Sequence, residues 1–513
     1  MVVVASFTAH SQCLPISTAT YYPLSSNGVE NTGVDAQGTY SPSGEFSAAV
    51  WDGDRPGIGT YFQGAVPDGP YSVSIAGSRQ GLTVLDPDVV IVPEITNAVL
   101  VVYQGISSNG NSNIYYEVWP RTGPGSGSLG PAPIAGPLTV SSAPSGRERH
   151  PNVDIDANGI AGIVWEDYGT TGGIKVRFID MLAGSPYVSF GSLSNFQAGS
   201  TIGLVSQPDI AMVDNAYYGT NKVHLVYKEI NGASESIAIL LYDFTLLSTG
   251  TSLPTPTYIS SIVVNPNTLN RPRIAGGYLH EDDHIITYER YDAGSMSYLI
   301  MEDGYEAGAR IPGKPSVENT NLTEIQGRPV VSYSGDLAMI MWEYDDRNTG
   351  IYSSTDEIHG QINLWNLGNW FPCLSLLEFP NTTSTRIPSI CGRASHVYHV
   401  WYDAVNSQIG FKFHSSSSPN IRKQNPAIST ENSNESTQKE LVVYPIPSSG
   451  VLNVVNAQPG VDYQLINVQG KLVQDGKFTS PAHILRLDEL PSGVYWLKLV
   501  DNQKPRTLRV VKH

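Results

Sequence analysis

One phrase is repeated seven times in the first four hundred residues of this 513-residue chain. Each copy has a short strand-like segment, a turn and a second segment that ends in an aromatic residue, and six of the seven begin with a proline. A period of about 60 residues with several short strands per copy is typical of a β-propeller. The closing aromatics, at intervals of 52, 62, 62, 61, 54 and 59 residues, are Trp51, Tyr103, Trp165, Tyr227, Tyr288, Trp342 and Trp401.

The repeat predicts an all-β fold, because one small sheet cannot bury both of its faces alone, whereas sheets packed radially cover each other. The segment Ile160–Trp165 is apolar throughout, as expected for a strand buried on both faces. We expect each repeat proline at the first residue of an inner strand, where no backbone donor is needed. The last copy lacks an outer strand after Gln408–Phe413, and Thr18–Pro23 is predicted to supply it.

The predicted architecture is a seven-bladed β-propeller over residues 13–414, followed by a small β-sandwich. Six blades preceded by an N-terminal strand domain are the alternative, because the copy that ends at Trp51 has no proline.

Composition excludes several classes of protein. Charged residues make up 15% of the chain and the formal net charge is −17. Affinity for nucleic acid depends on neutralising phosphates with Lys and Arg, so a nucleic-acid partner is not expected. No run of about 20 apolar residues occurs, so the sequence predicts no transmembrane helix.

The N-terminal segment Met1–Gln12 has a short apolar run followed by small and polar residues. We interpret residues 1–12 as the remnant of a secretory signal peptide, with an ordinary first strand as the alternative. Cys373 and Cys391 are 18 residues apart and would form a disulfide in an exported protein, or remain as two buried thiols.

The composition changes near the C-terminus. Residues 415–438 contain almost no apolar residues and are predicted to be a flexible linker. Residues 439–513 carry nine Lys or Arg against six Asp or Glu, a net charge of +3, which leaves −20 on the rest of the chain. Alternating strands separated by turns predict a sandwich of about seven strands in this segment.

Short motifs in residues 439–513 resemble those of a known export signal. The opening Tyr444-Pro445-Ile446-Pro447-Ser-Ser-Gly450, the turn Asn467-Val-Gln-Gly470-Lys471, the strand Leu490-Pro-Ser-Gly493-Val-Tyr495 and the basic ending with Lys512 are similar to the type A C-terminal sorting domain of the type IX secretion system. Ile446 stands where that family usually has Asn. The resemblance implies a Bacteroidota-type protein that is secreted or displayed at the cell surface, with the translocon and its sorting machinery as partners.

One candidate binding site lies at the start of the repeats. The residue before the repeat proline is polar or cationic in four copies, and a further arginine precedes it by one residue in the last copy. Equivalent positions of a propeller form a ring around the axis, and guanidinium groups there would bind a carboxylate in a bidentate manner. The alternative is that these cations pair with acidic neighbours. The candidate binding residues are Arg149, His150, Gln207, Arg271, Arg328 and Arg386.

Carboxylates also recur directly after the closing aromatics. A catalytic pair needs two residues made special by their surroundings, so a residue repeated in nearly every copy is interpreted as structural. No cofactor is indicated by any motif; Glu281-Asp282-Asp283 is interpreted as a solvated turn, with calcium binding as the alternative. The recurring carboxylates are Asp52, Glu166, Asp167, Glu229, Glu289, Glu343, Asp345 and Asp403.

Two functions from different classes follow. The favoured one is an exported binding or adhesion protein that recognises a polysaccharide or a surface partner, because no catalytic motif emerges. The alternative is a sialidase-like or polysaccharide-lyase-like enzyme that acts on acidic glycans, with His150, Arg271, Arg328 and Arg386 as candidate catalytic residues. The enzyme hypothesis needs these four side chains to converge in one pocket.

Overall fold

The computed structural model is almost entirely β-structure; within the part that it describes, α1 (Ala76–Arg79) is the one helix. None of the described residues belongs to a helix long and apolar enough to cross a membrane. The structure describes residues 21–23, 34–41, 44–53, 55–64, 68–92, 98–122, 128–141, 145–156, 159–169, 173–181, 191–199, 205–214, 221–231, 234–244, 258–264, 269–276, 284–292, 297–306, 309–310, 324–334, 337–346, 357–366, 369–378, 385–393, 396–403, 408–415, 442–444, 451–455, 460–467, 471–478, 482–487, 490–491, 493–500 and 506–512.

The described strands of the first compact unit, Met1–Pro426, form seven four-stranded antiparallel sheets. We number them in chain order by their inner strands. Sheet 1 is β2 (Val34–Ser41), β3 (Gly44–Trp51), β4 (Gly57–Gly64) and β5 (Asp68–Ser74); sheet 2 is β6 (Thr83–Ile91), β7 (Ala98–Ile106), β8 (Ser112–Pro120) and β9 (Ala135–Thr139); sheet 3 is β10 (Glu148–Ile155), β11 (Ile160–Asp167), β12 (Gly173–Asp180) and β13 (Gly191–Gly199).

The remaining sheets follow the same plan, and only sheet 7 combines strands from both ends of the unit. Sheet 4 is β14 (Val205–Asp214), β15 (Asn221–Asn231), β16 (Ser234–Phe244) and β17 (Tyr258–Val264); sheet 5 is β18 (Leu269–Gly276), β19 (His284–Asp292), β20 (Ser297–Glu306) and β21 (Ala309–Arg310); sheet 6 is β22 (Glu324–Ser334), β23 (Leu337–Asp346), β24 (Glu357–Asn366) and β25 (Asn369–Glu378); sheet 7 is β26 (Thr385–Arg393), β27 (His396–Asp403), β28 (Gln408–Ser415) and β1 (Tyr21–Pro23).

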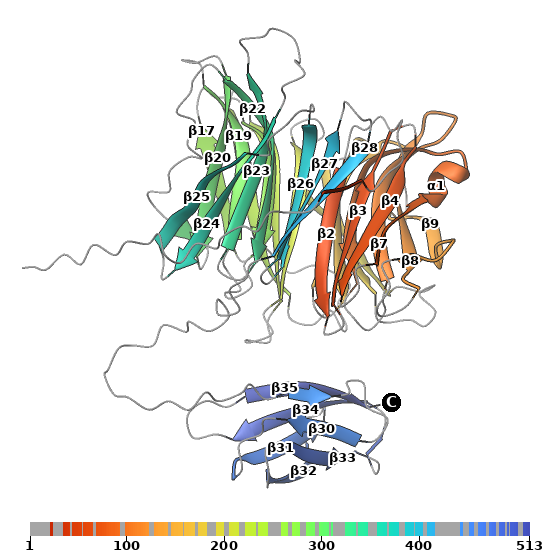
Figure 1. The fold of residues 1–513 in the computed structure, drawn as a ribbon, viewed down its shortest axis with the longest axis vertical. Helices are drawn as coiled ribbons and strands as arrows, with labels where there is room; N and C mark the ends of the chain where they lie inside the picture. Colours follow the sequence, from red (N-terminus) through yellow and green to blue (C-terminus); the bar gives the residue numbers. More distant parts are fainter. Residues whose placement is uncertain are drawn as a thin grey trace, which may run out of the picture. The chain divides into compact units, whose positions relative to one another are not determined.

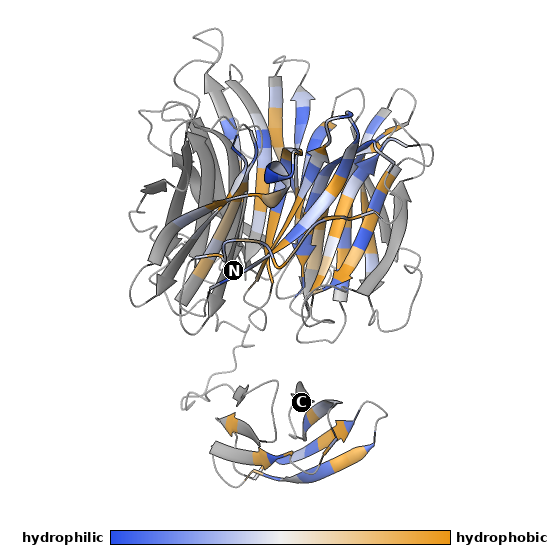
Figure 2. Ribbon diagram, turned by 90° about the vertical axis from the view of Figure 1, so that its right-hand side faces the viewer, coloured by the Kyte–Doolittle hydropathy of each residue, from blue (hydrophilic) through white to orange (hydrophobic). Residues whose placement is uncertain are grey.

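The hydrophobic core lies between consecutive sheets. On β7, Val101 and Tyr103 join a buried cluster with Val50 of sheet 1, whereas Leu100 and Val102 join a cluster with residues of sheet 3. Successive side chains of a strand point to opposite faces, so a strand packed on both faces must be apolar at every position. The unbroken apolar runs of the repeat therefore reflect burial on two sides, and Figure 2 shows hydrophobic residues concentrated along the strands.

Five of the closing aromatics take part in these clusters. Their exposed fractions are 6% or less, and each joins residues of its own sheet to those of a neighbouring sheet; the five are Tyr103, Trp165, Tyr227, Tyr288 and Trp342.

The inner strands contact one another in a closed cycle. β2 contacts β6, and the contacts continue through β10, β14, β18 and β22 to β26, which contacts β2 again. Figure 1 shows β26–β28 of sheet 7 beside β2 and β3 of sheet 1. Because sheet 7 takes its outer strand β1 from the N-terminal segment, pairing Tyr22 with Phe411, the predicted latch is confirmed for Tyr21–Pro23.

The position of the repeat prolines corrects one prediction. They lie inside the inner strands and not at their first residues: Pro151, for example, is the fourth residue of β10. The ladder shifts register there, from Arg149 to Asn152, and the same shift recurs in β6, β14, β18, β22 and β26. A bulge leaves a residue without its ladder bond, so the missing N–H of proline costs nothing at that point.

The second compact unit, Ala427–His513, has its own core. Its seven described strands form two sheets around buried Val454, Tyr463, Leu465, Phe478, Leu485, Leu487, Tyr495 and Leu497. The sheets are β29 (Val442–Tyr444), β30 (Val451–Val455) and β33 (Ala482–Arg486) in one, and β32 (Leu472–Lys477), β31 (Asp462–Asn467), β34 (Gly493–Val500) and β35 (Arg506–Lys512) in the other.

Side chains of the recognised motifs fasten the turns of this unit. The Asn467 carboxamide oxygen accepts the backbone N–H of Lys471 at 2.9 Å, which closes the turn between β31 and β32. The Tyr495 hydroxyl donates to the Pro491 carbonyl at 2.7 Å, and the buried Lys512 ammonium donates to the carbonyl of Leu490. The last strand is thereby tied to the loop that precedes β34.

Several predictions fall on residues outside the described part of the chain. These are the signal remnant at 1–12, the linker after Ser415, the turn at 281–283, the side chains of Cys373 and Cys391, and the motif positions Pro445, Pro447, Gly450 and Gly470 together with the side chain of Tyr444. Ser415 itself ends β28, so that strand extends one residue into the expected linker.

Candidate functional site

In sheets 2 to 6 the residue before the repeat proline has an unusual backbone conformation. Its φ lies in the left-handed region, which side chains other than glycine seldom adopt. The five residues, with φ between 45° and 55°, are Asp86, His150, Gln207, Arg271 and Arg328. Because these positions are equivalent in the repeat, the bulge presents five different side chains in one recurring backbone geometry.

Carboxylates that follow the closing aromatics hold this geometry in place across the sheet boundaries. The Asp52 carboxylate accepts the backbone N–H of Asp86 in the next sheet at 3.0 Å. Glu166 accepts the N–H of Gln207, and Glu289 accepts the N–H of Arg328 at 2.8 Å. The interpretation of the recurring carboxylates as structural is confirmed for these three residues.

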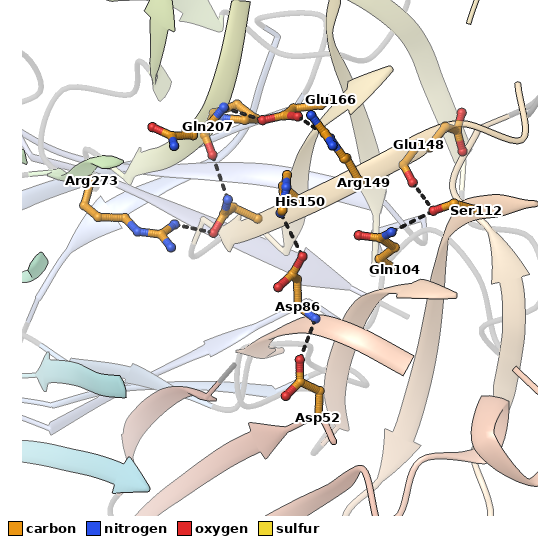
Figure 3. Close-up of polar contacts among 12 residues, drawn as sticks. Asp52, Asp86, Gln104, Ser112, Glu148, Arg149, His150, Glu166, Gln207 and Arg273 are labelled. Atoms are coloured by element: carbon orange, nitrogen blue, oxygen red, sulfur yellow. Dashed lines mark hydrogen bonds and ion pairs between the residues drawn. The ribbon is translucent and has the colours of Figure 1, made fainter. Parts of the chain in front are cut away.

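Three of the carboxylates that follow closing aromatics, Glu166, Glu289 and Glu343, also form ion pairs with arginines of their own sheets. Arg149 Nε lies 2.9 Å from Glu166, and Arg271 Nη1 lies 2.8 Å from Glu289. In sheet 6, Arg328 Nη1 lies 3.0 Å from Glu343. The three guanidinium side chains are 41–46% exposed, whereas Glu166 and Glu289 are at most 5% exposed. We call the five residues with left-handed φ, together with Arg149, Glu166, Glu289 and Glu343, the mouth belt. Its part around Glu166 is drawn in Figure 3.

Arg149 has a second contact that fixes its orientation. Its guanidinium lies 3.9 Å from the ring centroid of Tyr168, a cation–π contact. Burial by itself lowers the pKa of Arg149, but hydrogen bonds to Tyr168 and Glu166 outweigh it and raise the pKa above its usual value. Arg149 therefore stays charged and held, with part of its donor surface in solvent.

Sheet 4 breaks the pattern. Lys228 occupies the position after the closing aromatic and binds Glu235 at 3.1 Å and the Asn270 carboxamide oxygen at 2.8 Å. An ammonium cannot accept a hydrogen bond, so it cannot receive the N–H of Arg271. The carboxamide oxygen of Gln207 accepts that N–H instead, at 2.7 Å.

The side chain of His150 is held by a carboxylate of the preceding sheet. Its Nδ1 lies 2.7 Å from the carboxylate of Asp86 in sheet 2, and Figure 3 shows the two side chains directed at each other. Burial lowers the pKa of His150, but the hydrogen bond and charge of Asp86 outweigh burial and raise it. The imidazole is therefore better suited to donate a proton or hydrogen bond near neutral pH than to act as a base.

A second set of carboxylates, which we call the clasp tier, lies after the repeat proline in sheets 2, 3 and 4. In each clasp one oxygen accepts the N–H of the next residue and the other accepts an N–H of the next sheet: Asp88 binds Val153 at 2.6 Å, Asp154 binds Met212 at 2.7 Å and Asp209 binds Ile274 at 2.9 Å. Burial, with smaller contributions from Asp209 and Asp156, raises the pKa of Asp154 to about 7.

One arginine that the sequence analysis overlooked lies at the level of these clasps. Arg273, directly after Pro272, donates from Nη1 to the carboxamide oxygen of Asn152 at 2.7 Å, which joins sheet 5 to sheet 3. Asn152 in turn donates to the Pro208 carbonyl of sheet 4 at 2.7 Å. The signal in the sequence was a cation at the position where the three preceding copies have Asp88, Asn152 and Asp209.

The structure thus places the predicted site residues in two groups. Arg271 and Arg328 meet at Glu289, which binds the side chain of one and the backbone of the other. His150 is bound instead to Asp86 of sheet 2. Arg386 lies on β26 opposite Tyr402, the place that Arg149 has in β10, and its side chain is outside the described structure.

A comparison with protein families assigns the C-terminal unit. Residues 442–513 match the secretion system C-terminal sorting domain, the tail by which type IX secretion exports proteins to the cell surface or the medium. The earlier resemblance is therefore shown, and this chain is exported. A search of curated proteins finds no significant match.

Solved structures similar to the chain include β-propellers. The AofleA protein from Arthrobotrys oligospora is 9% identical (TM-score 0.39; 71% of this chain and 89% of that chain covered), and the six-bladed fucose-binding lectin of Aleuria aurantia is also 9% identical (0.37; 75% and 93%). The polysaccharide lyase Uly1 is 9% identical (0.41; 76% and 91%). Identities of this size transfer neither a ligand nor a reaction.

Proposed function

We propose that this exported protein is a glycan-binding propeller and that the mouth belt is its recognition surface. Secretion places the protein outside the cell, where polysaccharides and the glycans of other cells are accessible ligands. Half-exposed guanidinium groups, an imidazole and a carboxamide at equivalent positions provide many directional donors for sugar hydroxyls.

The observation that carries the proposal is that the belt cations are already paired. Glu166, Glu289 and Glu343 each bind one arginine, so the arginines offer fixed N–H donors and little net charge. A neutral, preorganised set of donors suits hydroxyl-rich ligands, since little ordering of side chains is left to binding.

We further infer that the seven sheets are the seven blades of one closed ring. The closed cycle of inner-strand contacts and the participation of sheet 1, whose β2 contacts both β6 and β26, support this count over six blades with a separate N-terminal domain. Five of the seven boundaries between blades would then carry a described position of the mouth belt.

Binding can be tested with substitutions that respect the left-handed backbone. Asn tolerates this conformation better than most residues, so H150N, R271N and R328N remove the side-chain donors with little added strain. We expect each to weaken binding to the best ligand of an oligosaccharide panel about tenfold, measured by calorimetry on the full chain. Leu138→Ser, on the 41%-exposed surface of β9, is the matched control and should bind as the wild type does.

A lyase-like or sialidase-like activity is the second candidate, and the His150–Asp86 pair favours it. A carboxylate that orients an imidazole and raises its pKa makes a competent general acid. Release of reducing ends from acidic polysaccharides, abolished by His150→Asn, would establish this activity. Binding without any turnover would support the glycan-binding function, and binding unaffected by all three Asn variants would contradict the mouth belt as the site.

A further inference from the structure

Arg273 differs from the belt arginines in what it binds. The guanidinium side chains of Arg149, Arg271 and Arg328 each lie within 3.0 Å of a carboxylate oxygen. The short hydrogen bond of Arg273, at 2.7 Å, goes to the neutral carboxamide of Asn152. Arg149, Arg271 and Arg328 are thus compensated directly by a bonded carboxylate, whereas the closest bond of Arg273 is to an uncharged group.

The nearest carboxylate does not change this conclusion. Asp209 Oδ1 lies 4.0 Å from Arg273 Nη1, beyond the length of a hydrogen bond. That carboxylate is already engaged as a clasp, with Oδ1 accepting the N–H of Ile210 at 3.0 Å and Oδ2 accepting the N–H of Ile274 at 2.9 Å. Its geometry is therefore set by the backbone of two sheets and leaves the guanidinium of Arg273, 39% exposed, accessible.

Besides Asp209, the neighbours of Arg273 along its strand and through its bond to Asn152 include cationic or donor side chains. Arg271 precedes it by two residues on β18, about 7 Å along the strand. Asn152, its partner, is two residues after His150 on β10. Figure 3 shows Arg273 reaching towards the region between His150 and Gln207. An anion that approaches from the mouth belt would therefore meet the guanidinium of Arg273 together with other hydrogen-bond donors of the belt.

We propose that Arg273 is the anchor for a ligand carboxylate, and that the glycan bound at the mouth belt carries a uronic-acid residue. Arg binds a carboxylate in a bidentate manner with two charge-assisted hydrogen bonds, which are stronger than its single bond to an amide. The carboxylate therefore displaces Asn152 from Arg273, while the sugar hydroxyls bind the belt. This inference rests on the proposed function and specifies the ligand class of the same site.

The test compares tri-galacturonate with its carboxyl-reduced, neutral trisaccharide by calorimetry on the full chain. Wild-type protein should bind the acidic trisaccharide about tenfold or more tightly than the neutral one, the worth of a charge-assisted hydrogen bond. R273Q should remove this preference and leave the affinity for the neutral trisaccharide within about twofold. N152D, which supplies a permanent carboxylate to Arg273, should remove the preference as well, and it keeps the test open if R273Q does not fold.

Controls separate the inference from the proposed function. R149Q alters a belt arginine and should weaken both trisaccharides by the same factor. A preference that persists in folded R273Q and N152D, while belt variants still weaken binding, overturns the role of Arg273 and leaves glycan binding intact. Tri-glutamate bound as tightly as tri-galacturonate overturns the assignment to a sugar acid. If the wild type binds neither trisaccharide, and belt substitutions leave its binding to the wider panel unchanged, the proposed function itself is contradicted.

Discussion

The mouth belt and the clasp tier are built from the same inner strands, yet they differ in the chemistry of their side chains and in what those side chains bind. Before the proline, the side chains are Asp86, His150, Gln207, Arg271 and Arg328, different in chemistry and mostly half-exposed. After the proline, the clasps are all aspartates whose two oxygens join neighbouring sheets through backbone donors. The first tier varies in chemistry from sheet to sheet, whereas the three clasps use one kind of side chain to fasten neighbouring sheets through their backbones.

The largest expected effect is the loss of a clasp. Asp88 is 7% exposed, and its oxygens accept the N–H groups of Val89 and Val153 at 2.7 and 2.6 Å. Asp88→Ala leaves two donors at a buried sheet boundary without acceptors, and we expect it to lower the free energy of unfolding by about 3 kcal/mol. Denaturant titration measures this value. Asp88→Asn keeps one acceptor and should lose about half as much; equal losses in the two variants would contradict the clasp.

A pH-dependent effect is expected at Asp154. Its pKa in the folded protein is raised to about 7 by burial, against about 3.9 in an unfolded chain. The folded state thus binds the proton more tightly, so this stabilisation is complete below about pH 4 and is lost as the pH rises through about 7. Between these limits stability should fall by roughly 1 kcal/mol per pH unit.

The matched variant for this prediction is Asp154→Asn, which cannot ionise. Melting temperatures of wild type and variant, compared from pH 4 to pH 8, should show a difference that falls as the pH rises to about 7 and then levels off. His150 and every other titrating group are common to both proteins, so the difference isolates Asp154. Parallel curves would show that this carboxyl does not titrate in the window.

The contrast between the tiers also explains what the sequence could predict. Spacing of the aromatics and the apolar runs predicted the sheets, the burial of the strand that ends at Trp165, and the latch at Tyr21–Pro23. Each of these depends on a local pattern or on a repeated one. Recurrence likewise predicted structural roles for Glu166 and Glu289.

Features that depend on ring geometry were beyond the sequence. A residue before proline usually adopts an extended backbone, so the left-handed φ of Arg271 arises from the bulge and from the donors that cross the sheet boundary. The Arg273–Asn152 bond joins residues 121 positions apart and skips a whole sheet. Only the closed arrangement of the inner strands brings these two residues together.

The next effect concerns a residue that serves both assembly and recognition. Glu166 is 2% exposed and binds Arg149 with one oxygen and the N–H of Gln207 with the other. Glu166→Gln keeps an acceptor for the backbone but turns an amide donor towards the guanidinium, so we expect a loss of about 2 kcal/mol in unfolding free energy. The double variant with Arg149→Gln should recover part of this loss, whereas additive losses would show that the ion pair contributes nothing of its own.

The smallest effect is expected at Arg328 of the mouth belt. It separates the strain of the backbone conformation from the contribution of the side-chain ion pair. Arg328 has a φ of 50° and a side chain that is 41% exposed. Arg328→Ala removes the ion pair with Glu343 and places a β-carbon in a backbone conformation that alanine disfavours, whereas Arg328→Asn removes the same ion pair with less strain. We therefore expect Asn to be more stable than Ala by about 0.5–1 kcal/mol, and Gly by a similar amount. Thermal unfolding of the three variants tests this ranking. Equal stabilities would mean that the left-handed turn stores no strain, and the tier before the proline would then be free to carry any residue.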